Sequence, residues 1–197
     1  DEQDISFMGG VSKKLPYTYL LMIIGTLALT GFPFLSGFYS KDAIIEYAFL
    51  DYSFIGYLAA SIGIFTAFLT SIYSWRLIFK TFHGDYKNKK INISEIHESP
   101  LIIILPLILL SVGAIFSGLL FKDLFIGADS YTSFWRESIF FLNNLSSEHP
   151  PKWFVLLTPT LVTVSIFLSY LIFVKDKNNR FTEYLIETNK PMYNFFK

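Results

Sequence analysis

The chain has 197 residues, of which 52% are hydrophobic, 19% are aromatic and only 16% are charged, and its formal net charge is zero. A soluble domain carries about a quarter charged residues, so this balance and a mean hydropathy of +0.45 point to lipid as the solvent. The neutral charge and the lack of a basic arm argue against nucleic-acid binding, and the absence of cysteine excludes disulfides and cysteine-ligated zinc or iron–sulfur centres within the chain.

The apolar runs predict an all-α integral membrane protein with about four transmembrane spans, the first of them a broken helix. The chain begins with Asp and lacks the zones of a signal peptide, so we expect it to be a fragment of a longer protein. The predicted segments, in order, are a polar loop over 1–16, a discontinuous transmembrane helix over 17–50, a transmembrane helix over 54–81, a cytoplasmic or matrix loop over 82–100, a transmembrane helix over 101–121, an interfacial segment over 122–152, a transmembrane helix over 153–174 and a polar tail over 175–197.

The first membrane element is too long for one straight crossing. A helix over residues 17–50 would measure roughly 50 Å, against about 30 Å of hydrocarbon. Gly31 and Pro33 lie near its middle, and Pro33 disfavours helix at the residue before it. We therefore expect two half-helices, over 17–30 and 36–50.

The basic residues predict the orientation. Four spans place the first loop, the 82–100 loop and the tail on one side of the membrane. That side carries twelve cations, and they are Lys13, Lys14, Arg76, Lys80, Lys87, Lys89, Lys90, Lys175, Lys177, Arg180, Lys190 and Lys197. The other side has Lys122, Arg136 and Lys152, so the positive-inside rule makes the first side cytoplasmic, or matrix in a mitochondrion.

Lys41 belongs to neither side. It could extend its side chain to the nearer interface, or it could be buried among helices or beside a water-filled cavity. Apolar sequence continues beyond it to Leu50, which favours burial. A buried amine loses its charge readily and can relay protons, all the more so if Ser36 caps the second half-helix and places Lys41 near its positive end.

Two carboxylates follow Lys41. Asp42 points about 100° away from Lys41 around a helix but shares a face with Glu46, four residues on. Desolvated together, the two would hold a proton between them and suit an exit route for protons; equally, both could be solvated at the outer interface. His83, His97 and His149 have no spacing typical of a metal site, and no phosphate loop, cofactor box or catalytic constellation is present.

Several motifs resemble the distal antiporter-like membrane subunits of respiratory complex I, the L subunit of bacterial NADH:quinone oxidoreductase and chain 5 of the mitochondrial enzyme. The most specific match is Ser-Gly-Phe-Tyr-Ser-Lys-Asp over residues 36–42. The other matches are the Lys-Lys-Leu-Pro stretch at 13–16, Gly-Phe-Pro-Phe-Leu at 31–35, Ser-Trp-Arg at 74–76, Phe-Lys-Thr-Phe-His-Gly at 79–84 and His-Glu-Ser-Pro at 97–100. They follow in family order over about residues 8–174.

The resemblance implies the C-terminal half of such a subunit, with Lys41 in the line of intramembrane charges that relays protons. It also implies flavin and iron–sulfur clusters in partner subunits but no cofactor in this chain, other complex I membrane subunits as neighbours, and NADH and quinone bound elsewhere. The expected location is a bacterial plasma membrane or a mitochondrial inner membrane. The alternatives are the large subunit of a multisubunit sodium/proton antiporter, a membrane-bound hydrogenase subunit, or a purely structural scaffold.

Overall fold

The computed structural model describes residues 4–88, 91–126, 134–136, 138, 150–175, 187–188 and 190, and the regular structure within them is all helical. Three stretches of the described chain are long and apolar enough to cross a membrane, which confirms the expected all-α membrane fold. They are α3 (Phe54–Phe82), α4 (Leu101–Phe125) and the run Lys152–Lys175. The last consists of α6 (Lys152–Val155), α7 (Leu157–Tyr170) and a π-helical stretch, η5 (Leu171–Lys175).

Two shorter helices stand where the sequence predicts a broken one. α1 covers Pro16–Thr30 and α2 covers Ser36–Leu50, with a short non-helical link between them. Pro16 occupies the first position of α1, where its missing N–H costs no hydrogen bond. Ser53, just before α3, accepts a hydrogen bond from the Gly56 N–H at 2.9 Å and so caps that helix.

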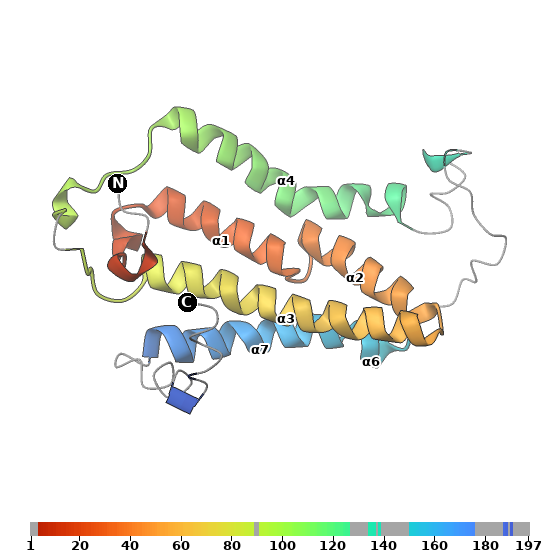
Figure 1. The fold of residues 1–197 in the computed structure, drawn as a ribbon. Helices are drawn as coiled ribbons and strands as arrows, with labels where there is room; N and C mark the ends of the chain where they lie inside the picture. The colour runs from red at the N-terminus through yellow and green to blue at the C-terminus, as the bar shows by residue number, and fades with distance from the viewer. Residues whose placement is uncertain are drawn as a thin grey trace.

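The helices are stacked in layers. α1 and α2 follow each other and lie between α4 on one side and α3 on the other (Figure 1). α3 also packs along α7, and both helices run from the same end of the molecule to the other (Figure 1). The broken helix is therefore covered on two faces, and its junction lies inside the stack.

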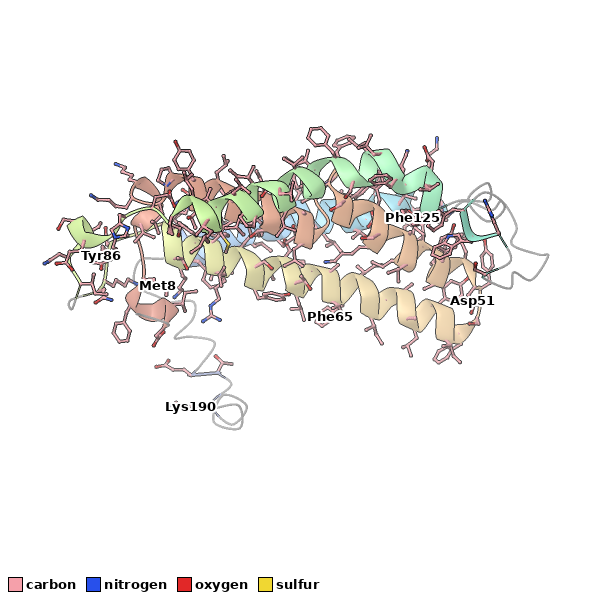
Figure 2. The ribbon with its side chains drawn as sticks, turned by 90° about the horizontal axis from the view of Figure 1, so that it is seen from above. Met8, Asp51, Phe65, Tyr86, Phe125 and Lys190 are labelled. Carbon is pink, nitrogen blue, oxygen red and sulfur yellow. The ribbon has the colours of Figure 1, made fainter. Side chains whose placement is uncertain are left out.

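The two ends of the stack differ in their loops. Figure 2 shows Met8 and Tyr86 at one end and Asp51 and Phe125 at the other. The first end carries the short 3₁₀ turns η1 (Ile5–Phe7), η2 (Val11–Lys13) and η3 (Ile93–Glu95), and we call it the basic end because the cationic loops predicted to face the cytoplasm or matrix begin there. We call the second the outer end.

Most large apolar side chains point outward, as expected for a surface in contact with lipid or other apolar neighbours. α4 shows this best, since only Ile104 and Ser111 on it are buried. α4 also extends one turn beyond the predicted end at residue 121, so that Lys122 and Asp123 are helical. Most of the predicted interfacial segment and of the polar tail lies outside the described residues.

Candidate functional site

The junction between α1 and α2 is built by the backbone. Gly31 ends α1 in the left-handed conformation, with φ of 80°, and its N–H donates to the Ala28 carbonyl at 3.3 Å. The Phe32 N–H donates to the Leu27 carbonyl at 3.0 Å. Left-handed glycine with these bonds is the common way to end a helix, because glycine has no Cβ to clash.

The first turn of α2 passes directly against the last turn of α1. A Cβ added to Gly37 would lie 1.8 Å from the Ala28 carbonyl oxygen, far inside any permitted contact. The two half-helices therefore touch backbone to backbone, which only glycine allows at this point. This contact fixes how the second half-helix is offset from the first.

Lys41 lies in the second turn of α2 and is half-buried. Its side chain reaches back over the junction, because a Cβ placed on Gly31 would lie 3.5 Å from the Lys41 Cδ. The carboxyl end of the α1 helix dipole carries partial negative charge, which favours a nearby cation, whereas burial disfavours it. The Lys41 amine is therefore subject to two opposing effects, since the end of α1 favours its charged form and burial favours its neutral form.

Ser36 does not cap α2, so the condition that would have placed it at the N-cap is not met. It lies within the helix, and the N-cap position belongs to Leu35, whose side chain makes no capping hydrogen bond. Lys41 still falls in the second turn of α2, close to its positive end.

Asp42 is buried, with 7% of its surface exposed, and among the described residues neither of its carboxyl oxygens has a hydrogen-bond partner. Glu46, one turn later, is half-buried. The two line the same cavity of about 230 Å³ at the outer end of the molecule, so the structure brings together the carboxylates that the helical spacing places on one face. Asp42 is not solvated at the surface.

Two charged residues of this cavity were missed from the sequence. Lys122 and Asp123, from the last turn of α4, line it together with Asp42 and Glu46. The sequence-based bounds ended this transmembrane helix at residue 121 and placed Lys122 and Asp123 in the predicted interfacial segment. The apolar residues Leu124 and Phe125 beyond the pair were the signal that the helix continues.

A second polar site lies at the basic end. The Glu98 carboxylate accepts hydrogen bonds from the Tyr17 N–H at 2.9 Å, the Thr18 N–H at 3.3 Å and the Thr18 hydroxyl. It thereby caps α1 from a loop 80 residues away. Desolvation raises the pKa of Glu98, but these bonds and one from the Ser99 N–H outweigh it, so that the net pKa lies below the ordinary value.

His83 stands beside this cap. Its Nε2 and the Tyr19 hydroxyl share a hydrogen bond of 2.7 Å, and burial lowers the pKa of the imidazole. A neutral imidazole suits this position, because one ring nitrogen can then accept from the hydroxyl. Within the described part of the chain, no three His, Asp or Glu side chains are grouped so that they could hold a metal ion.

Comparison with known proteins gives matches along most of the chain. A family model described as NADH:quinone oxidoreductase/Mrp antiporter, TM, matches residues 1–70. The chain is 44% identical over 175 residues to the NADH-ubiquinone oxidoreductase chain 5 of Marchantia polymorpha, which covers 86% of this chain and 26% of that protein. The proteins of the same name from Chondrus crispus and Arabidopsis thaliana are 40% and 39% identical, over 98% and 100% of this chain and 31% and 30% of their own lengths. The chain thus spans roughly a quarter to a third of the length of these relatives.

Proposed function

We propose that the chain belongs, over the segment it shares with them, to the NADH-ubiquinone oxidoreductase chain 5 family, and that it forms part of the proton-translocating membrane arm of that enzyme. It is a multi-pass membrane protein. In the proposed role, NADH oxidation and quinone reduction take place on other subunits, which hold the flavin and the iron–sulfur clusters. This chain contributes proton-carrying side chains, and its neighbours are the other membrane subunits of the complex.

One observation carries the proposal. Lys41 is half-buried over the backbone junction of a broken helix, next to the buried Asp42. A lysine in this setting exchanges its proton at low cost, because burial opposes the charge that the end of α1 favours. We assign Lys41 to the proton relay, Asp42 to the route that leads outward, and Glu46 to the same route with weaker support.

Protons would move from the basic end toward the outer end. Lys41 lies at the junction of α1 and α2. The carboxylate cavity is bounded by the last turn of α4, whose final residue Phe125 marks the outer end in Figure 2. The positive-inside rule puts the basic end in the matrix or cytoplasm. The names and organisms of the relatives favour the mitochondrial inner membrane over a bacterial plasma membrane.

The test is Lys41→Met in the whole enzyme reconstituted into liposomes. NADH oxidation and proton uptake into the vesicles are measured together, and we expect fewer protons per NADH. The matched control is Lys87→Met, which removes an exposed loop cation and should leave the ratio unchanged. An unaltered proton-to-NADH ratio in the Lys41 variant, at normal assembly, would remove the relay assignment.

The second candidate is the large subunit of a multisubunit sodium/proton antiporter, because the matching family model names both classes of protein. The two are separated by the energy source. In an antiporter, proton movement follows an imposed sodium gradient without NADH, and Lys41→Met abolishes that movement. In the respiratory enzyme, proton movement depends on NADH and quinone.

A further inference from the structure

The cavity at the outer end gathers acidic and basic side chains from two helices. It measures about 230 Å³, and its lining includes Asp42, Glu46 and Tyr39 from α2, Lys122 and Asp123 from α4, and Val155 from α6. Four of these side chains carry a carboxyl or an amino group, two from each of two helices. The volume has room for several water molecules, and the lining offers them polar partners.

Asp42 is the buried carboxyl group of this cavity. It is more than nine-tenths buried, and within the described part of the chain its two carboxyl oxygens lack hydrogen bonds. An ionised carboxylate in such a place is costly unless a cation approaches it. The group therefore either keeps its proton or requires a positive charge close to it.

Lys122 is a cation that lines the same cavity. Its Nζ lies 3.9 Å from an Asp123 carboxyl oxygen and 5.7 Å from the centre of the Tyr39 ring. The Lys122 and Asp123 side chains are 43% and 88% exposed, and an ion pair between such groups contributes at most about 1 kcal/mol. Little energy holds the amine in its present place, and its four-carbon stem is flexible.

We propose that Lys122 is a movable counter-charge that controls proton release from the Asp42 and Glu46 carboxyls. While these carboxyls are protonated, the amine rests on Asp123 and the Tyr39 ring. When a carboxyl O–H bond breaks and its proton passes to water in the cavity, the amine turns inward and pairs with the new carboxylate. When a proton from the Lys41 side neutralises the carboxylate again, the Lys122 amine returns to Asp123 and the Tyr39 ring. The inference rests on the proposed function and adds a residue on α4 to it.

The charges that face this step come from two helices. α2 supplies Asp42, Glu46 and the neighbouring Lys41, whose charge acts on Asp42, and α4 supplies Lys122 and Asp123. α6 adds Val155 to the lining and α3 adds no residue to it. Without Lys122, the carboxyl pair holds its proton more tightly, so release requires a more alkaline outer solution.

The experiment measures proton pumping by the whole enzyme in liposomes. The pH is varied on the side that the outer end of the molecule faces, which is the vesicle lumen when protons are taken up, and we call it the outer pH. For Lys122→Gln we expect the outer pH at half-maximal pumping to rise by about one unit, equivalent to a tenfold lower proton activity. Lys122→Arg keeps the charge and should restore the wild-type profile. Lys87→Gln, an exposed loop cation, is the control for a general loss of positive charge.

The variant Asp123→Asn should shift the pH profile in the opposite direction. It removes the resting partner of Lys122, so the amine spends more time in the cavity and the half-maximal outer pH should fall. Because the Asp123 side chain is 88% exposed, this variant tests the idea even if Lys122→Gln fails to assemble. A wild-type profile in Lys122→Gln, equal losses in the Gln and Arg variants, or an unmoved profile in Asp123→Asn would overturn the inference. None of these results bears on Lys41, whose own test is the proton-to-NADH ratio.

Discussion

Replacing Gly37 by alanine tests whether backbone contact sets the geometry of the broken helix. The added Cβ would lie 1.8 Å from the Ala28 carbonyl oxygen, which is 1.6 Å short of an ordinary contact at 3.4 Å. The obstacle is backbone and cannot rotate away, so α1 and α2 have to separate. Overpacking costs about 1–3 kcal/mol, and we expect the upper end of that range here. For a chain of this size that corresponds to a melting temperature lower by roughly 6–12 °C.

The matched control is Gly25→Ala in the middle of α1. A Cβ there meets nothing within 4 Å, and alanine is the better helix former by about 0.5–1 kcal/mol. Both variants are followed by thermal unfolding of the detergent-solubilised protein and by the proton-to-NADH ratio in liposomes. The reasoning is refuted if Gly37→Ala melts at the same temperature as Gly25→Ala.

Three further predictions concern the polar contacts. Desolvation raises the pKa of Glu98, but its hydrogen bonds outweigh this effect, so the pKa is lowered in the folded protein. The stability that the carboxylate contributes is therefore present above the unfolded pKa of 4.5 and is lost as the pH falls through the folded pKa. Glu98→Gln should cost about 1 kcal/mol or less at neutral pH and flatten the acid limb of the unfolding curve. Burial lowers the pKa of His83, so stability declines as the pH falls from 6.5 through the folded value, and His83→Gln should remove that decline in melts recorded at about pH 5–7. The buried hydroxyls of Ser71 and Ser165 are hydrogen-bonded at 2.5 Å between α3 and α7, and a double-mutant cycle to alanine should give a coupling of about 0.6 kcal/mol, with a value near zero counting against the contact.

The sequence predicted those parts of the fold that depend on local chemistry. Apolar length indicates the helices, and Gly31 and Pro33 indicate the break, because each acts on its own backbone. Helical spacing places Asp42 and Glu46 on one face, and the structure brings them to one cavity. These inferences needed no knowledge of what packs against the helix.

What the sequence could not predict depends on contacts between distant segments. Nothing in the spacing of Glu98 from Thr18 indicates that the carboxylate caps α1, since 80 residues separate them. Lys122 was placed in the predicted interfacial segment, whereas α4 continues past it to Phe125. A cation is favoured in the last turn of a helix, but its place there shows only once the end of the helix is known. The close approach at Gly37 is visible only once both half-helices are placed.

The Glu98 cap has a mechanical consequence. It fastens the loop before α4 to one end of α1, and Gly37 is pressed against the other end. α1 has 15 residues and is therefore a rod about 22 Å long with both ends held. While Glu98 caps α1, a displacement of that loop along the helix axis would move α1 as a unit. Gly31 at its far end, against which the Lys41 side chain lies, would move with it.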